Sequence, residues 1–384
     1  MTSEDAQSGA FEQTMALSPG GKVEVRQGRG RLSVAGWDRP EVRLLAYGTD
    51  VSRVLHIHSR GDYCSIVVRE SRGLFGGLLS PSVELELQVP TTAILALGLG
   101  ATDLTLKGVL GAARIDTGSG NVCCSEVGSV DVDCGSGNVE VRGAAGQVRV
   151  DSGSGNITLA GIRGDVRIDG SSGNLNLEQV QGSLEADTGS GNIVVRSLAG
   201  ESLKLDTGSG DIQAGEVRVR TISLDTGSGN IGLGLGAVEP RGSYSVETGS
   251  GDVELRLPAD AQVAVRIEAQ RRRIENALPL TNVVVDDDEL RGMMGDGSAS
   301  LRVESHGRVR LSTYSPEPPA VPAPAAPAGL AAVPAAASQD PSVAPDLAEE
   351  YRRVLKMVEE GKLKPEEADE ILRALEEGTE EEQA

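Results

Sequence analysis

The residues of this chain most suggestive of chemistry are acidic residues that stand directly before glycine-rich turns. The segment from Ile115 to Asn121 reads IDTGSGN. Asp-Thr-Gly-Ser surrounds the catalytic aspartate in pepsin-like and retroviral aspartic proteases, where two such carboxylates share one proton. The motif therefore raises the question of acid–base chemistry on a peptide bond.

The motif occurs eight times, and this number argues against a protease, which needs only two such loops. The acidic residues are Asp116, Asp133, Asp151, Asp169, Asp187, Asp206, Asp225 and Glu247. The residues that close the turns are Asn121, Asn138, Asn156, Asn174, Asn192, Asp211, Asn230 and Asp252. Successive acidic residues are 17, 18, 18, 18, 19, 19 and 22 positions apart. A period this regular indicates a repeat architecture.

Each repeat has the pattern of two strands around the glycine-rich turn. Val148 and Val150 precede one turn and Ile157 and Leu159 follow it, with polar residues between them. Such alternation predicts half-buried strands. One repeat cannot bury its apolar face alone, but stacked repeats form a continuous core. The sequence therefore predicts an all-β fold, a β-solenoid (single-chain β-helix) whose rungs repeat about every 18 residues.

The composition fits a thin solenoid and excludes several partners. Aromatic residues make up only 2% of the chain and there are 50 glycines, so the interior must be built from small aliphatic side chains. The net charge of −21 disfavours nucleic acid and anionic membranes, which need a basic surface. No run of apolar residues is long enough to span a membrane, so no transmembrane segment is expected.

The acidic residues and their Asn or Asp partners allow a structural and a metal-binding interpretation. Side chains of both types bond to backbone N–H groups one or two residues on, and stacked Asn side chains can form a ladder. Carboxylates about 4.8 Å apart on neighbouring strands repel each other, and calcium could relieve this repulsion. Known calcium-binding β-rolls place two glycine-rich loops in each turn, whereas this chain has one. We therefore expect a structural turn ladder and no catalytic residue, metal or cofactor, with a calcium-binding β-roll as an alternative.

The chain is expected to contain five segments. They are a disordered N-terminus (1–20), a β-solenoid (21–314, regular rungs about 96–257 and irregular ends), a Pro/Ala-rich linker (315–345), a helical hairpin (346–378) and an acidic tail (379–384). The first 21 residues lack the basic and apolar regions of a secretory signal, which predicts a cytoplasmic protein.

The helical hairpin supplies most of the candidate interaction residues. Two helices of this length cannot hold a stable core alone, so their apolar faces should meet a partner protein, another copy of the chain or the solenoid. A homo-oligomer is one outcome. Phe75 lies in a separate apolar loop that could also contact a partner. The candidate interaction residues are Tyr351, Val354, Leu355, Val358, Ile371, Leu372, Leu375 and Phe75.

These features together resemble the bacterial putative-adhesin family, domain of unknown function four-zero-nine-seven. That family has tandem T-x-S-G-[DN]-[IV] turns between short strands, after a G-x-[VL]-x-V and G-W-[DN] stretch that Gly30 to Asp38 match. The resemblance covers roughly residues 20–312. The tail LKMVEEGKLKPEEADEILRAL is similar to the short C-terminal helical module called SHOCT, which is associated with oligomerisation. The resemblance implies a β-solenoid, a non-enzymatic role and a link to the cell envelope or surface, although no signal sequence is visible.

Motifs of nucleotide binding, serine hydrolysis and zinc proteolysis do not occur. The sequence thus favours a non-enzymatic structural or interaction scaffold with an oligomerising or partner-binding helical pair. The alternative is a carbohydrate-binding or polysaccharide-cleaving surface β-helix, which the scarcity of aromatic residues disfavours. A calcium-binding β-roll is the third possibility.

Overall fold

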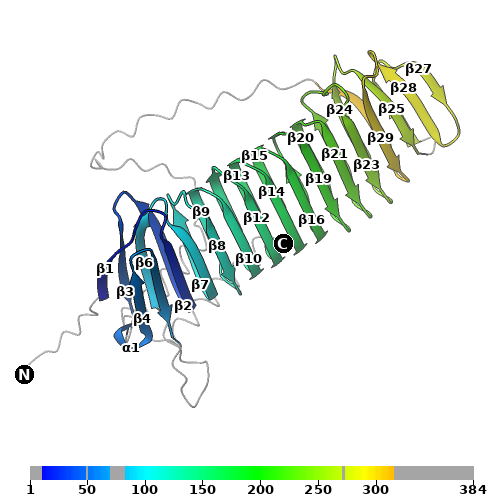
Figure 1. The fold of residues 1–384 in the computed structure, drawn as a ribbon. Coiled ribbons are helices and arrows are strands. Elements are labelled where there is room, and N and C mark those ends of the chain that lie inside the picture. Colours follow the sequence, from blue (N-terminus) through cyan, green and yellow to red (C-terminus); the bar gives the residue numbers. More distant parts are fainter. Residues whose placement is uncertain (1–10, 49–50, 70–82, 270–272, 315–384) are drawn as a thin grey trace, which may run out of the picture. The chain divides into compact units, whose positions relative to one another are not determined.

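The computed structural model describes residues 11–48, 51–69, 83–269 and 273–314 (Figure 1). These residues lie in one compact unit that spans Met1–Ala320. Within the described ranges almost every element is a strand, and the only α-helix is the short α1 (Val51–Val54). The described residues contain no helical segment with the length and apolar character that a membrane span requires.

Two columns of parallel strands form the body of the solenoid. The strands of the first column precede the glycine-rich turns: β8 (Ala113–Thr117), β10 (Val130–Ser136), β12 (Val148–Ser154), β14 (Val166–Ser172), β16 (Leu184–Ser190), β19 (Ser202–Thr207), β21 (Thr221–Thr226) and β23 (Ser243–Thr248). The strands of the second column follow the turns: β9 (Val122–Val127), β11 (Val139–Ala144), β13 (Ile157–Arg163), β15 (Leu175–Gln181), β17 (Ile193–Val195) with β18 (Leu198–Ala199), β20 (Ile212–Arg218), β22 (Ile231–Leu235) and β24 (Val253–Pro258). The predicted β-solenoid is confirmed.

Register explains why the repeat produces a continuous core. Each acidic residue stands opposite the acidic residue of the next rung, as Asp133 stands opposite Asp116 and Asp151. Because side chains alternate across a strand, fixing this register stacks every apolar residue on its counterpart. The resulting interior consists almost entirely of buried Val, Ile, Leu and Ala side chains, and Tyr244 is the largest side chain fully buried there.

The N-terminal end is built from strands that leave sequence order. β2 (Lys22–Trp37) and β7 (Ile94–Lys107) each run through both columns, and β7 lies between β2 and the first regular rung. Outside β2 lie the parallel strands β5 (Tyr63–Val68) and β6 (Val83–Pro90). They pair with the antiparallel strands β4 (Leu55–Arg60) and β3 (Glu41–Tyr47), and β1 (Phe11–Ala16) pairs antiparallel with β3.

The strand β1 corrects the expectation of a disordered N-terminus through residue 20. Residues 11–16 form a strand, and the side chains of Met15 and Leu17 are buried in the core. The apolar positions in this stretch are too few to give an alternating pattern of their own. Its structure therefore depends on pairing with β3, which sequence periodicity does not reveal.

The C-terminal end also departs from sequence order. β29 (Ala299–Ser305) and β30 (Val309–Tyr314) stack directly on β23 and β24, so a regular rung exists beyond residue 257. β25 (Val263–Glu268) and β26 (Ile274–Asn276) lie outside β29 and β30. β28 (Glu289–Met294) then pairs antiparallel with β25, and β27 (Thr281–Val285) pairs antiparallel with β28. Figure 1 shows these two strands at the end of the stack.

Candidate functional site

The glycine-rich turns are held by a buried hydroxyl column. The hydroxyl of Thr226 donates to the carbonyl of Gly210 in the preceding rung at 2.9 Å and accepts from the N–H of Gly229 in its own turn at 3.1 Å. Equivalent pairs of bonds are made by Thr207, Thr248 and Ser305. The Thr of the Asp-Thr-Gly-Ser motif therefore links consecutive turns at Thr207, Thr226 and Thr248. This gives the motif a structural role.

The hydroxyl column allows a test with a matched control. Thr226→Val should lower the free energy of unfolding by about 1–3 kcal/mol, because it leaves the Gly229 N–H and the Gly210 carbonyl without their partner. Thr188→Val should be close to neutral, because the Thr188 hydroxyl is buried and has no hydrogen-bond partner among the described residues. Urea denaturation of both variants measures the difference. Equal losses would show that the bonds at Thr226 contribute nothing.

The residues that close the turns form a ladder between rungs. The N–H of Asn138 donates to Oδ1 of Asn121, and the N–H of Asn156 donates to Oδ1 of Asn138. The ladder begins at the side chain of Asp103 and ends at the backbone N–H of Arg308. Each N–H lies 2.7–3.1 Å from the side-chain oxygen that accepts its hydrogen bond. The other members are Asn174, Asn192, Asp211, Asn230 and Asp252. These bonds join residues 17 or more positions apart, unlike the local turn bonds that the sequence suggested. Each side chain thus binds one rung to the next.

The acidic residues form a second column, on the outer face of the strands. The structure places Asp116 to Glu247 in one line and extends that line through Glu304, Glu268 and Glu289 at the C-terminal end. No group of three or more His, Cys, Asp or Glu side chains that could hold a metal ion occurs among the described residues. The acidic column is accordingly a band of negative charge along one face.

Within this column the carboxyl of Asp187 has a perturbed pKa. Partial desolvation, followed by the charges of Asp206 and Asp169, raises the pKa of Asp187 above its ordinary value. A carboxyl whose pKa is higher in the folded than in the unfolded chain favours folding when it is protonated. The contribution of this carboxyl to the free energy of unfolding is therefore complete at pH values below its pKa in the unfolded chain. The contribution is lost as the pH rises through its pKa in the folded chain.

We expect Asp187→Asn to raise the melting temperature at pH 7, because the variant cannot ionise at this position. The gain should disappear at about pH 3, below the ordinary pKa of an aspartate, where the parent carboxyl is protonated in both states. Added salt should reduce the gain at pH 7, because it screens the neighbouring carboxylates. Thermal melts of parent and variant at the two pH values provide the measurement. A larger gain at pH 3 than at pH 7 would contradict this assignment.

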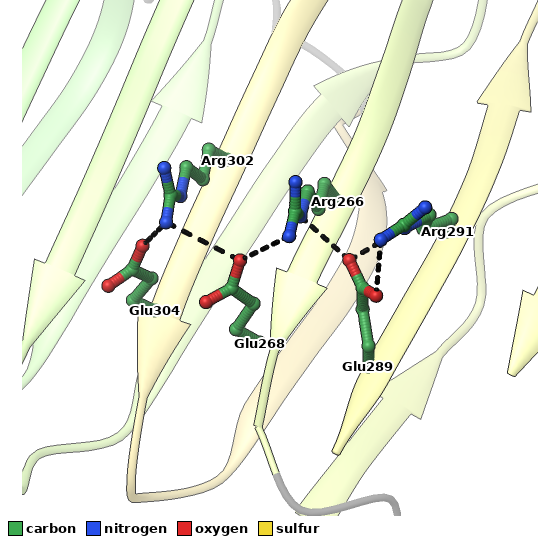
Figure 2. A network of polar contacts seen from close by, with 6 residues as sticks. All are labelled: Arg266, Glu268, Glu289, Arg291, Arg302 and Glu304. Carbon is green, nitrogen blue, oxygen red and sulfur yellow. Dashed lines mark hydrogen bonds and ion pairs between the residues drawn. The ribbon is translucent and has the colours of Figure 1, made fainter. Parts of the chain in front are cut away.

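At the C-terminal end a row of arginines runs beside the acidic column. Arg302, Arg266 and Arg291 stand opposite one another on β29, β25 and β28. Arg266 binds Glu268 at 2.9 Å and Glu289 at 2.7 Å. Figure 2 shows that the ion pairs run without a break from Glu304 to Arg291. This network joins β29, β25 and β28 through their outward side chains.

The network also perturbs a pKa at its outer end. The hydrogen bond from Arg291 is the main cause that lowers the pKa of Glu289, and the charge of Arg266 adds to it. Arg291 donates to both carboxylate oxygens of Glu289, at 2.6 and 2.7 Å. Bidentate pairs of this kind fix geometry as well as charge. This pair lies within β28 and orients Glu289, whose ion pair with Arg266 joins β28 to β25.

A groove with a volume of about 660 Å³ lies on this outer face. Its floor is formed by β23, β25 and β29, and the hairpin of β27 and β28 contributes Val284, Met293 and Asn282. Arg266, Arg291 and Arg302 also line it. The groove therefore combines small and apolar side chains with guanidinium groups that the neighbouring glutamates orient.

The cysteines offer no reactive thiolate. Burial raises the pKa of Cys64 to about 11 and that of Cys124 to about 12. The pKa values of Cys123 and Cys134 are raised as well, chiefly by desolvation. The thiolate is the nucleophilic form of cysteine, so these four thiols are protonated and unreactive at neutral pH.

The candidate interaction residues of the sequence analysis remain predictions. The linker and the helical hairpin lie outside the described residues, and so do all of these candidates. The candidates are Phe75, Tyr351, Val354, Leu355, Val358, Ile371, Leu372 and Leu375.

Sequence reasoning missed the hydroxyl column and the rungs that lack the full motif. In such rungs, Asp103 belongs to the turn ladder, whereas Ser305 and the N–H of Gly307 belong to the hydroxyl column. The stretch from Glu304 to Arg308 reads ESHGR, which keeps the acidic residue, the hydroxyl and one glycine but is one residue shorter than the motif. A comparison that allowed for a deletion of one residue could have found this rung.

A model of the Toastrack DUF4097 family matches residues 70–307. A model of a SHOCT-like domain matches residues 349–380. A search of curated proteins found no match to this chain.

Solved structures that match this chain include three from Bacteroides fragilis and Parabacteroides distasonis. A putative adhesin from Bacteroides fragilis is 12% identical, covers 80% of this chain and 98% of its own, and has a TM-score of 0.24. A putative adhesin from Parabacteroides distasonis is 11% identical, with the same coverage and a TM-score of 0.33. A putative lipid binding protein from the same organism is 11% identical, covers 79% of this chain and 96% of its own, and has a TM-score of 0.29. Likenesses at this level assign no activity to this chain.

Proposed function

Because the chain belongs to the Toastrack DUF4097 family and carries a SHOCT-like domain after it, we propose that it is a non-enzymatic scaffold. In this proposal the β-solenoid is a stiff rod that presents binding surfaces. The helices predicted for residues 346–378 join several copies of the chain or hold a partner protein. Neither step involves catalysis.

The observation that carries this proposal is the double ladder between rungs. The Asn or Asp side chains link successive turns from Asp103 to Arg308, in addition to the backbone bonds of the parallel strands. The hydroxyls of Thr207, Thr226, Thr248 and Ser305 add a second link at their own turns. Because neighbouring rungs are fixed at two or three places, bending the stack would break several bonds at once. Stiffness of this kind suits a spacer or a display platform.

The chemistry of the described residues agrees with a role in binding. The recurring aspartates lie on an exposed face, the cysteine thiols are held protonated, and no metal-binding cluster is found in the described ranges. The surface instead offers a band of negative charge and a groove lined by arginines. Such features recognise partners through charge and shape.

Joining several rods through the helical module would give multivalent binding. Linking binding modules raises overall avidity by about 10²–10⁴ without any new contact, provided that the geometry allows simultaneous engagement. A weak interaction of each rod could then become a stable attachment. The cytoplasmic location predicted from the N-terminus and the envelope link implied by the family both stay predictions.

The mass of the native particle tests the proposal. Light scattering should give the full chain a mass of at least twice 39.8 kDa, and a chain ending at residue 345 should be monomeric. Leu355→Glu, on the predicted apolar face, should also dissociate the particle, whereas Lys356→Glu should leave it intact. A monomeric full-length chain that captures no partner through residues 346–378 would refute the proposal.

A further inference from the structure

An exposed apolar strand at the C-terminal end of the stack suggests a second interaction surface. Six large hydrophobic side chains are exposed in the described part of the chain, and three of them are consecutive on β27. Val283 is 46% exposed, Val284 61% and Val285 41%. Exposed apolar residues that stand singly are normal, but a contiguous group often marks a binding site.

The strand β27 also has an open edge. It pairs with β28 through Val284 opposite Arg291 and Val285 opposite Leu290, and no described residue pairs with its other side. Figure 1 shows β27 as the outermost strand at this end. An open edge presents unpaired N–H and C=O groups that can template another strand.

Valines lie on both faces of this edge. Val284 lines the groove with Met293 on the outer face, whereas Val285 points to the opposite face, since side chains alternate along a strand. Val285 stands opposite the buried Leu290. A strand added beside β27 would therefore cover apolar side chains on both of its faces.

Charge decides which partner fits this edge. Asp286, Asp287 and Asp288 follow β27 directly, and all three are exposed. A second copy of this edge would not complement them in an antiparallel pair, because Leu278, Pro279 and Leu280, which precede its own strand, carry no charge. If the partner strand runs antiparallel to β27, the residues opposite these aspartates are those that precede the partner strand in its sequence.

The edge has features that restrict pairing to a matching partner. Asn282 has a left-handed φ of 52°, and the register with β28 shifts between Thr281 and Val284. Bulges and charges at an edge limit indiscriminate strand pairing. A partner must consequently pair over Val283 to Val285 and carry positive charge where the aspartates lie.

We propose that β27 is a docking edge for an extended segment of a partner protein, which adds as an antiparallel strand. The segment would carry two or three Lys or Arg residues followed by alternating β-branched residues. The basic residues would lie opposite Asp286–Asp288, and the β-branched residues would cover the valines. This site is independent of the helical module and goes beyond the scaffold role proposed above.

Peptide binding to the full-length protein tests this inference. The probe is a fluorescein-labelled peptide KRKVTVTV, whose anisotropy is measured with increasing protein. Two further peptides are EDEVTVTV, which reverses the charge, and KRKVPVTV, in which proline removes an N–H from the strand. The basic peptide should bind with a Kd at least tenfold lower than either of the others.

Protein variants locate the site. Val284→Lys should raise the Kd of the basic peptide at least tenfold, and Val285→Lys, on the opposite face, should act similarly. Leu110→Lys is the matched control, because Leu110 is as exposed as Val284, at 61%, and lies outside any strand. The basic peptide should bind this variant with the same Kd as the parent protein. Circular dichroism melts establish that each variant is folded. If one of the two valine variants does not fold, the other still tests the site.

Several results would overturn the inference. Equal binding of KRKVPVTV would mean that charge alone attracts the peptide, and unchanged binding to both valine variants would place the site elsewhere. Absence of binding to the basic peptide would exclude strand addition at this edge. A concentration-dependent doubling of mass that Val284→Lys abolishes would identify a second copy as the occupant and would also contradict the proposal.

Discussion

Gly210→Ala is expected to lower the free energy of unfolding by about 3 kcal/mol, the upper end of the range for overpacked interiors. A Cβ atom at this position would lie 1.8 Å from the carbonyl oxygen of Gly191 in the preceding rung. That oxygen belongs to the backbone and cannot rotate away. Relief would require the two rungs to separate, and this would break the parallel pairing of β16 with β19 and the bond from the Thr207 hydroxyl to the Gly191 carbonyl.

The matched control for this substitution is Gly215→Ala. A Cβ atom at Gly215 meets its nearest atom, the carbonyl oxygen of Arg196, at 3.5 Å, which is an ordinary contact. Both changes add the same methyl group to neighbouring stretches of the solenoid. Guanidinium denaturation should therefore show a large loss for Gly210→Ala and a change below about 1 kcal/mol for Gly215→Ala. Similar losses at the two sites would refute the close approach of the turns.

Tyr244→Ala should lower the free energy of unfolding by about 4 kcal/mol, as for other large aromatic side chains removed from a core. Tyr244 is 1% exposed and fills the rung that follows the longest step of the repeat. Its hydroxyl accepts from the N–H of Glu239 at 2.9 Å and lies 3.4 Å from the carbonyl of Val219, to which it donates. Removing the side chain would leave a cavity and an unpaired N–H.

Tyr244→Phe separates packing from hydrogen bonding. The ring remains, so only the hydroxyl bonds are lost, at a cost of about 1 kcal/mol. Burial also raises the pKa of the Tyr244 hydroxyl. Because the folded state favours the neutral phenol, this residue's contribution to stability should decline as the pH rises above about 10. Equal losses for the Phe and Ala variants would contradict a role of the ring in packing.

Much of this architecture could be predicted because one period controls it. The aspartates at the 17- to 22-residue steps fix the number and order of the rungs, and Val, Ile and Leu at alternating positions fix the buried face. Both signals are local, and each repeat reinforces the others. The strand columns therefore follow from the sequence without knowledge of long-range contacts.

The ends of the stack could not be predicted in the same way. The insertion of β29 between β23 and β25, and the pairing of β1 with β3, depend on contacts between distant segments. Val283 to Val285 look like an ordinary buried strand in the sequence, yet they are exposed in the structure. No periodic pattern distinguishes an inner strand from an edge strand.

The candidate site was only partly visible for a related reason. The Asn residues were recognised as a ladder, but the partners of the Thr hydroxyls depend on how closely two turns approach. The arginine row requires the antiparallel register of β28 against β25, which places Arg291 beside Arg266. Sequence spacing gives no information about that register.

Counting rods in single particles tests the central claim most directly. Negative-stain electron microscopy of the full-length protein should show particles that each contain two or more rods, with a rod length on the order of 70 Å for a column of about sixteen strands. The chain ending at residue 345 should give single rods of the same length. Single rods in both samples, with no partner protein attached to the full chain, would contradict the account of a multivalent scaffold.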